Sequence, residues 1–454
     1  MSEPTGSKTP LVKIYGRLGS AEAYQLRDFL HRCDVPFEWI ALECDAQARL
    51  PVCEFPDGTR MESPTIRQVI EKLGWFANPS RAEYDLAIYG AGPAGLSAAV
   101  YGSSDGLKTV LVERWAVGGQ AASSPRIENY LGFPEGTSGA QLAESAREQA
   151  YKFGTEILLA RKGVRAEMTA GKGVGYLEDG TRIVARASIC ATGIEYRRLG
   201  LPGAERFLGA GLYYGAGASE AALTKGEEVY IVGGGNSAGQ AAMHFAGFAK
   251  RIFIVIRGES LKETLSQYLL DRLGSTPNVE VLPHTEIIAL RGDKVLEEIT
   301  LADRATGQNR SAKTRWLFVC AGGVPQTDWA AEVGVACDEG GYLLTGPDLL
   351  RGRQRPAGWP LDRDPFYLET SLPGIFAAGD VRHGSVKRVA SAVGEGAMAV
   401  AFVHRYLANG WVRRSVNLQT SLKFLIAARI LALWNLQVLE TWGRFGSLMR
   451  RRDP

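Results

Sequence analysis

The fold is decided by residues 84–95, YDLAIYGAGPAG, in which a short apolar strand runs into a glycine loop of the form GxGxxG. A helical stretch at 96–103, a second strand at 108–112 and an acidic residue, Glu113, follow directly. A strand, glycine loop, helix, strand and terminal acid in this order are typical of a domain that binds a dinucleotide at the end of a parallel α/β sheet. The loop alone is a weak signal, whereas the complete unit is a strong one.

Each glycine of this loop has a physical task. Gly90 permits the sharp turn, Gly92 lets the backbone approach a pyrophosphate, and Gly95 lets the helix pack closely on the strand. The helix N-terminus then faces the phosphates, and Glu113 can accept hydrogen bonds from ribose hydroxyls. The loop residues predicted to contact the cofactor are Gly90, Ala91, Gly92, Pro93, Ala94 and Gly95.

A second strand followed by a glycine loop occurs at residues 228–238, EVYIVGGGNSA. A helix is predicted at 238–249 and a strand at 251–256. That strand ends on Arg257, and an arginine can bind the 2′-phosphate of NADP, which an acid would repel. The alternative, a solvated charge at a strand end, is kept open by Glu259 close by. The predicted NADPH contacts are Gly233, Gly235, Asn236, Ser237, Arg257 and Lys262.

Two further segments belong to the first unit, one before the second unit in the chain and one after it. Residues 190–193, CATG, form a strand and turn before the second unit, and residues 373–380, PGIFAAGD, form a strand that ends in Gly-Asp after it. We predict an α/β protein with two Rossmann-type domains, the second inserted into the first, and hence a two-dinucleotide flavoprotein. The cofactor contacts expected here are Thr192, Gly193, Gly379 and Asp380.

At this point the residues resemble the low-molecular-weight thioredoxin reductases of the pyridine nucleotide-disulfide oxidoreductase family. The resemblance runs from about Tyr84 to Leu407. It is carried by GAGPAG (90–95), VGGQ (117–120), IENYLGFPEG (127–136), ATG (191–193), LGLPGAE (199–205), VGGGNSAGQAA (232–242), FAAGDVR (376–382) and KRVASAVGEGAMA (387–399).

The resemblance implies a function and a set of site residues. It implies FAD and NADPH as cofactors, a homodimer, and an NADPH domain that rotates to deliver hydride to the flavin. It places Gly119, Gln120 and Asn129 on the flavin ring and Asp380 on the ribityl-phosphate part. It also places Lys387, Arg388 and Val389 at the ring. The expected domains are an FAD domain at 84–197 and 326–410 and an NADPH domain at 198–325.

One departure from the family concerns the redox cysteines. The family keeps a CxxC pair about 13 residues before the NADPH glycine loop, which here falls on Ala216-Gly217-Ala218-Ser219, within one position. Ala216 and Ser219 thus take the usual cysteine positions. The chain's six cysteines include no CxxC, and Cys190 and Cys320 lie in strand patterns that predict core positions.

Electrons are therefore expected to leave from the flavin itself. The candidate acceptors are a carrier protein such as a ferredoxin or flavodoxin, a small oxidant, or a thiol partner that supplies the cysteines. A non-catalytic flavin and NADPH sensor is the competing hypothesis. His383, after the Gly-Asp motif, is a weak catalytic candidate, because its position predicts a place near the flavin phosphates. The six cysteines also show no zinc-ligand spacing, so no metal site is predicted.

Residues 1–76 resemble a glutaredoxin or thioredoxin domain. Their pattern predicts the order βαββα, with Pro51 where that fold keeps a cis-proline and Ser63 capping the last helix. The thiol pair of that fold would fall on residues 20–23, SAEA, so this domain lacks its own CxxC. We expect an adaptor or docking role, with thiol or glutathione binding through Cys53 as the alternative, and a linker at 77–83.

The charge of the chain is concentrated at its end. The 454 residues carry a net charge of only +3, which argues against a chain-wide nucleic-acid binder. Residues 411–454 hold eight basic and two acidic side chains and an apolar helical stretch at 422–439. This tail could pack on the protein, lie on an anionic membrane surface, or cover the flavin with Trp434 or Trp442. The sequence shows no signal peptide, so a cytoplasmic protein with possible membrane-peripheral contact is expected.

Overall fold

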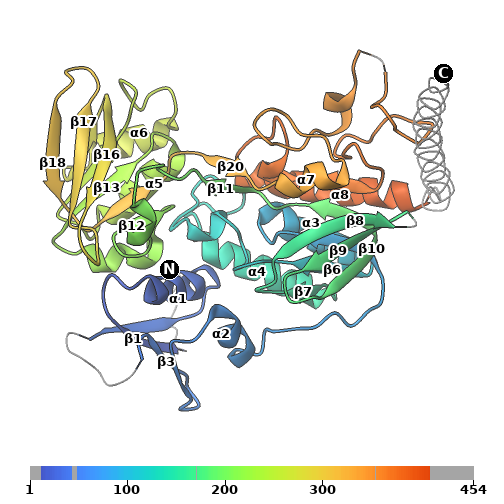
Figure 1. Ribbon diagram of the computed structural model, residues 1–454, viewed down its shortest axis with the longest axis horizontal. Coiled ribbons are helices and arrows are strands. Elements are labelled where there is room, and N and C mark those ends of the chain that lie inside the picture. The colour runs from blue at the N-terminus through green and yellow to red at the C-terminus, as the bar shows by residue number, and fades with distance from the viewer. Residues whose placement is uncertain (1–11, 43–48, 170, 353, 409–454) are drawn as a thin grey trace, which may run out of the picture.

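The computed structural model describes residues 12–42, 49–169, 171–352 and 354–408. The predictions for the tail at 411–454 lie outside these residues. Figure 1 shows three units: an N-terminal unit (12–76), a first nucleotide unit built from 84–193 and 326–408, and a second nucleotide unit (198–322). In the described ranges, no helix is both long and apolar enough to cross a membrane.

The N-terminal unit has the predicted βαββα order extended by one strand. Its four-stranded sheet runs β2-β1-β3-β4, with β1 and β2 parallel, and the Leu50–Pro51 peptide is cis. The last helix is capped by Thr65, whose side chain and Gln68 form a reciprocal capping box, so the prediction of Ser63 as the cap was wrong. The elements are β1 (Val12–Gly16), α1 (Ala21–Arg32), β2 (Phe37–Ala41), β3 (Val52–Glu54), β4 (Arg60–Glu62) and α2 (Ile66–Lys72).

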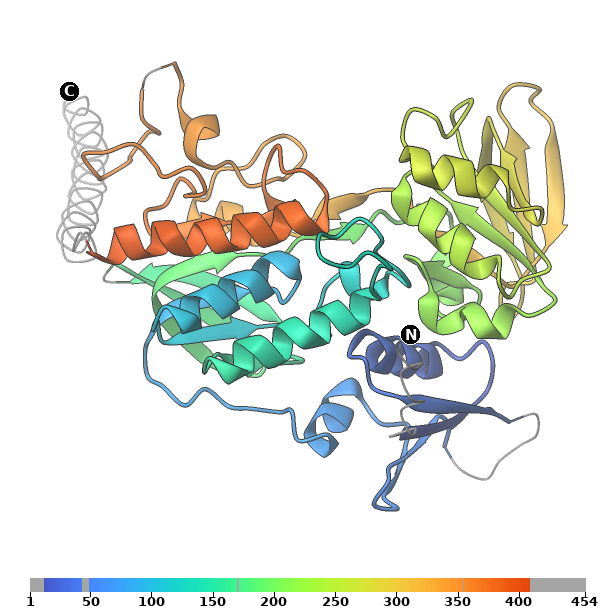
Figure 2. The same ribbon diagram turned by 180° about the vertical axis from the view of Figure 1, so that it is seen from behind.

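The first nucleotide unit is a mixed sheet covered by helices. The strand order is β7-β6-β5-β10-β9-β8, and β21 joins β10 from the far end of the chain. Helices α3, α4 and α8 lie together on one side of this sheet (Figure 2). The elements are β5 (Tyr84–Tyr89), α3 (Pro93–Ser104), β6 (Thr109–Val112), η1 (Ala121–Ser123), α4 (Gly139–Lys152), β7 (Glu156–Leu158), β8 (Gly163–Thr169), β9 (Lys172–Leu177), β10 (Arg182–Cys190), α7 (Asp328–Val333), η4 (Gly346–Leu349), β21 (Ile375–Ala377), η5 (Gly379–Val381) and α8 (Val389–Ala408).

The second nucleotide unit has a parallel sheet of order β12-β19-β13-β14-β15 and an antiparallel sheet β16-β17-β18. The helix after its glycine loop starts earlier than the predicted 238–249, because Gly235 is its N-cap, and it ends earlier, at Phe245. The elements are η2 (Ala204–Phe207), β12 (Leu212–Tyr214), η3 (Ala218–Thr224), β13 (Glu228–Val232), α5 (Asn236–Phe245), β14 (Arg251–Val255), α6 (Gln267–Gly274), β15 (Val279–Leu282), β16 (Thr285–Arg291), β17 (Glu298–Asp303), β18 (Asn309–Lys313) and β19 (Leu317–Val319).

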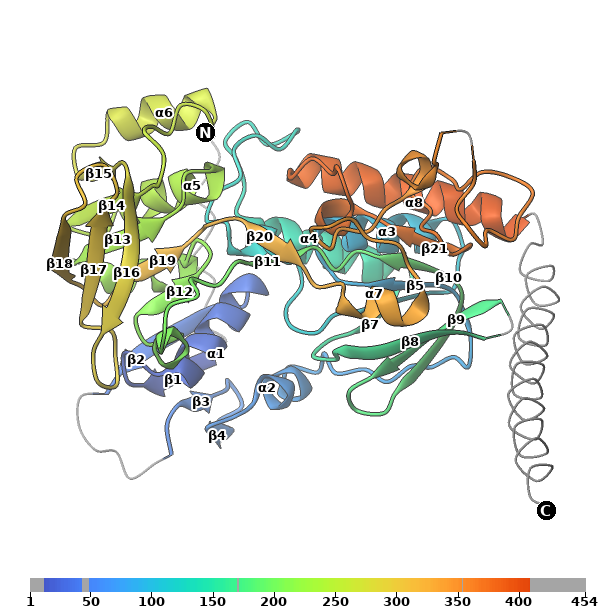
Figure 3. The ribbon, with the colours of Figure 1, turned by 45° about the horizontal axis from the view of Figure 1, so that its top comes forward.

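Two short strands carry the chain between the nucleotide units. β11 (Ile194–Tyr196) runs out of the first unit and β20 (Gly323–Pro325) returns to it, and they pair antiparallel (Figure 3). The second unit is therefore inserted into the first, as predicted. The predicted fold class, an α/β protein with two Rossmann-type domains, is confirmed.

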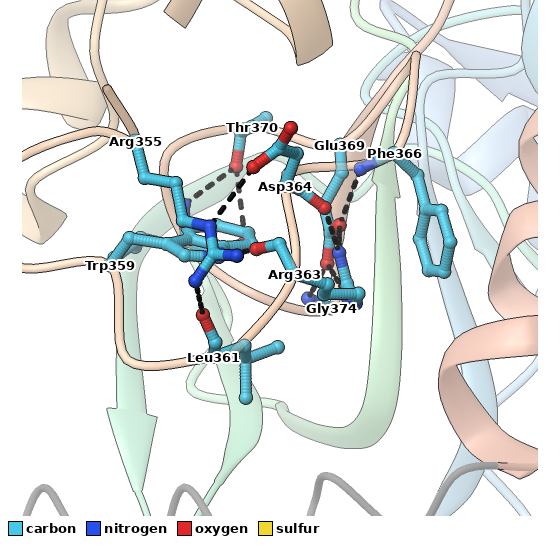
Figure 4. A network of polar contacts seen from close by, with 10 residues as sticks. Arg355, Trp359, Leu361, Arg363, Asp364, Phe366, Glu369, Thr370 and Gly374 are labelled. Carbon is cyan, nitrogen blue, oxygen red and sulfur yellow. Dashed lines mark hydrogen bonds and ion pairs between the residues drawn. The ribbon is translucent and has the colours of Figure 1, made fainter. Parts of the chain in front are cut away.

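A buried carboxylate holds the segment that leads into β21. Glu369 is fully buried and is bound by the Arg363 guanidinium through two bonds of 2.6 and 2.9 Å (Figure 4). The backbone N–H groups of Phe366 and Gly374 donate to the same carboxylate at 2.9 and 3.0 Å. Four donors satisfy a buried charge that would otherwise be costly. This fixes the entry to β21, which delivers Gly379 and Asp380 to the site.

Candidate active site

The first glycine loop is built so tightly that only glycine fits at two of its positions. Gly90 has φ +103°, and a Cβ there would lie 2.4 Å from the Ala191 carbonyl oxygen. A Cβ on Gly95 would lie 1.8 Å from the Gly90 carbonyl oxygen. Helix α3 begins directly after Gly92, its N-cap, so its free N–H groups point out of the loop toward an anion.

Glu113 links the end of β6 to this loop. Its carboxylate accepts hydrogen bonds from the backbone N–H groups of Ala91 at 2.7 Å and Trp115 at 2.9 Å. Burial raises the pKa of Glu113, and the two backbone donors oppose that shift. The carboxylate therefore braces the loop and at the same time lines the cleft beside it.

The strand β21 delivers the second half of this cradle. Gly379 donates its N–H to the Glu395 carboxylate at 2.7 Å, and the Lys387 ammonium donates to the Asp380 carbonyl oxygen at 2.8 Å. Burial raises the pKa of the Asp380 carboxyl, and the positive charge of Lys387 acts against that shift. Lys387 thereby ties Asp380 to the start of α8.

The second glycine loop repeats the design, with Ala238 at the position that Gly95 holds in the first loop. Gly233 has φ +141°, and a Cβ there would lie 2.6 Å from the Cys320 carbonyl oxygen. Nothing lies within 4 Å of a Cβ on Gly235, and the Asn236 side chain accepts a bond from the Ser266 N–H at 2.8 Å. Arg257 follows β14 as an exposed side chain at the rim of the cleft.

Both loops open into one cleft of about 2460 Å³. Its walls bring together the predicted residues of both nucleotide units. The predicted residues that line it are Gly90, Gly92, Pro93, Ala94, Glu113, Gly119, Gln120, Asn129, Thr192, Gly193, Gly233, Gly235, Asn236, Ser237, Arg257, Gly379, Asp380, Lys387, Arg388 and Val389. Ala91 and Gly95 lie behind the loop instead, where they support it.

Two predicted residues do not belong to the cleft. His383 pairs its Nδ1 with the Asp338 carboxylate at 2.6 Å, outside the lining residues. Lys262 is exposed and also outside the lining residues. Both residues follow a motif that lines the cleft, and spacing along the sequence could not show on which side of it they lie.

The positions expected for the redox cysteines hold no thiol. Ala216 lines the cleft, whereas the Ser219 hydroxyl lies outside it and donates to the Glu220 carboxylate at 3.4 Å. Cys190 and Cys320 lie at the strand ends next to the two glycine loops and line the cleft, but burial raises the pKa of each thiol to about 12. Neither provides a thiolate near neutral pH.

The N-terminal unit contributes to the same cleft, which the sequence did not indicate. Ala21, Tyr24, Gln25 and Arg32 of α1 line it. The Arg32 guanidinium donates to the Gly119 carbonyl oxygen at 3.2 Å and to the Asp28 carboxylate at 2.7 Å. Cys53, by contrast, is fully buried, and burial raises its pKa to about 12, so it offers no thiol-binding surface.

The comparisons with known proteins agree with this geometry. Residues 84–396 match the model of the pyridine nucleotide-disulphide oxidoreductase family, and the chain belongs to that family. It is 34% identical over 326 residues to the thioredoxin reductase of Bacillus subtilis (strain 168), covering 71% of this chain and 95% of that protein. The N-terminal unit lies outside the matched residues.

Solved structures give the same result. The thioredoxin reductase of Lactococcus lactis in its FR conformation superposes with a TM-score of 0.64 at 26% identity, over 72% of this chain and 99% of that one. The thioredoxin reductase of T. acidophilum gives a TM-score of 0.63 at 29% identity, with the same shares of the two chains.

The cofactors of this family are FAD and NADPH, and the site fits them. The two glycine loops leave backbone-lined cradles that a Cβ would fill. The Thr192 hydroxyl is buried at the cleft wall with no hydrogen-bond partner among the described residues, as expected for a group that awaits a ligand. The first unit fits FAD and the second fits NADPH.

Proposed function

We propose that this protein is an NADPH-dependent FAD oxidoreductase that passes electrons from the flavin directly to an acceptor. The observation that carries the proposal is the absence of a thiol pair. The sequence contains no CxxC, and Ala216 and Ser219 stand where the family keeps its cysteines. A relay through a protein disulfide needs a thiolate nucleophile, and this segment has none.

The five cysteines within the described residues support the same conclusion. Burial raises the pKa of Cys33, Cys53, Cys190 and Cys320 to about 12, and it also raises the pKa of Cys337. A thiol that stays protonated is a poor nucleophile and a poor partner for exchange. The direct route from flavin to acceptor is therefore favoured over a substitute internal relay.

When bound, FAD accepts two electrons as a hydride and passes them on. The chain's own residues hold and orient the cofactors. The N-termini of α3 and α5 would face the pyrophosphates of the bound cofactors, and Glu113 braces the first loop. Arg257 offers a fork of donors to a 2′-phosphate, which supports NADPH rather than NADH as the source of hydride.

Rapid mixing of the flavin-loaded protein with NADPH tests the proposal. We expect the visible flavin band to bleach. Reoxidation by ferredoxin, flavodoxin, a quinone or a dithiobenzoate disulfide should be faster than reoxidation by air for at least one of them. Replacement of both Ala216 and Ser219 by cysteine provides a matched variant in which thioredoxin should gain turnover relative to the natural chain.

Two outcomes would contradict direct electron transfer from the flavin to an acceptor. If the natural chain turns over thioredoxin as fast as NADPH reduces its flavin, thiols supplied by the partner are sufficient. Bleaching with no acceptor faster than air would favour a non-catalytic redox sensor over an enzyme.

A further inference from the structure

The two nucleotide units are joined covalently by a narrow connection. The chain passes from one to the other through β11 and returns through β20, which pair in register from Ile194↔Pro325 to Tyr196↔Gly323. An exposed ion pair, Arg272 with Glu128 at 2.6 Å, also links them. Exposed pairs contribute little to stability, because water screens both charges. These contacts alone would leave the second unit free to pivot about the ribbon.

Helix α1 of the N-terminal unit contacts both nucleotide units. On the first unit, Arg32 donates to the Gly119 carbonyl oxygen at 3.2 Å, and the Phe29 ring packs against Trp115 at 6.4 Å between centroids. On the second unit, the Tyr24 ring packs edge-on against Tyr213 at 5.0 Å. One rigid helix therefore spans the gap that the ribbon leaves open.

The strongest of these contacts is a buried ion pair. The Arg27 guanidinium donates twice to the Glu220 carboxylate, Nε to Oε1 at 3.0 Å and Nη2 to Oε2 at 2.8 Å. The two side chains are 1% and 0% exposed. The Trp39 ring lies 4.1 Å from the guanidinium carbon and orients it. Removing one member of such a pair leaves a lone buried charge, which is strongly destabilising.

The rest of the N-terminal unit is also fixed. The Phe76 ring is held between the Arg67 and Arg161 guanidinium groups at 4.4 and 4.6 Å. Arg161 donates to the Ala77 carbonyl oxygen at 2.9 Å, and the Ser80 N–H donates to Glu156 at 2.9 Å. The linker is therefore bound along the first nucleotide unit, which places α1 at a defined position.

We propose that the N-terminal unit is a built-in clamp. Helix α1 holds the second nucleotide unit in the orientation in which both cradles open into one cleft, and Arg27–Glu220 is its latch. The latch stands on η3, whose first residues belong to the segment 216–219 expected for the family's thiol pair. The clamp does not depend on the proposed electron acceptor, because it concerns the arrangement of the units alone.

Distances between spin labels test the clamp in the full chain. Labels go on cysteines introduced at Tyr151 in α4 and Phe248 in the second unit, both exposed, with Cys44 and Cys337 replaced by serine. We expect one narrow distance distribution without NADPH and the same distribution with it. Arg27→Met and Glu220→Gln should each add a second, separate distance.

Two further variants make the result specific. Arg60→Met removes an exposed arginine of the same unit, 59% accessible, and should leave the distribution narrow. The double variant Arg27→Met/Glu220→Met removes both charges and should restore a narrow distribution, because no lone charge remains. If Arg27→Met unfolds the N-terminal unit, Glu220→Gln decides, because that residue belongs to the other unit. A broad distribution in the unsubstituted chain, or a narrow one in Glu220→Gln, would overturn the clamp.

Discussion

The two nucleotide cradles follow one plan with different tightness. In the first, the loop is crowded by its own backbone and Glu113 is buried behind it. In the second, Ala238 takes the place that Gly95 holds in the first, and Arg257 stands exposed at the rim. The difference shows that the first loop has no room for a side-chain carbon at Gly95, whereas the second loop already carries one at Ala238.

The largest expected effect comes from giving the first loop the residue of the second. Gly95→Ala puts a methyl group 1.8 Å from the Gly90 carbonyl oxygen, which cannot move without breaking the turn. We expect purification without FAD and a loss of about 3 kcal/mol or more in the free energy of unfolding. Flavin absorbance per protein and urea unfolding measure this.

The matched control is Ala238→Gly in the second loop. It should lower stability by only about 1 kcal/mol, the usual penalty of glycine in a helix, and leave NADPH binding intact. If Gly95→Ala retains full flavin occupancy, the first cradle is not tighter than the second.

The next largest effect concerns Arg257, the charged residue that follows the strand of the second cradle. Arg257→Ala should raise the KM for NADPH about tenfold or more and leave the KM for NADH nearly unchanged, because a charge-assisted bond to the 2′-phosphate is lost. Steady-state flavin reduction with each nucleotide provides the ratio. Arg251→Ala, at the opposite end of the same strand, is the control and should change neither KM. An unchanged ratio in Arg257→Ala would assign that side chain to solvent.

A smaller effect is expected for Glu113→Gln. The amide keeps the size of the carboxylate but can accept only one of the two backbone bonds from Ala91 and Trp115. We expect FAD affinity to fall about tenfold, measured by flavin fluorescence on titration into the apoprotein. Glu259→Gln makes the same chemical change at the exposed end of the other cradle and should leave FAD affinity unaltered.

The smallest effect should come from the two buried cysteines at the cleft wall, Cys190 and Cys320. Burial raises the pKa of each thiol to about 12, so both should resist thiol reagents at pH 8 until the protein unfolds. Cys320→Ala should leave the rate of flavin reoxidation within about twofold, because we assign no electron relay to it. A large loss of turnover would instead reveal a thiol in the path.

The sequence predicted the nested fold and most of the cleft because local motifs carry both. A glycine loop between a strand and a helix fixes its own geometry, so the predicted residues Gly90, Gly233 and Asp380 line one cleft. His383 and Lys262 lie outside its lining, because their positions depend on where the chain turns after a motif ends. The wall formed by α1 was missed, since Tyr24 and Arg32 belong to a separate unit and no local pattern encodes docking between units.

The pairing of β11 with β20 has a consequence for the chain's modularity. Tyr196 and Gly323 lie opposite each other, so the ends of the whole second unit meet at one point. A two-residue Asn-Gly turn could join them as an ordinary β-hairpin in place of residues 197–322. What remains would keep the complete seven-stranded sheet and its flavin cradle. The second unit is in this sense a removable domain. The shortened chain would bind a single cofactor, and another nucleotide-binding domain could be inserted at the same turn.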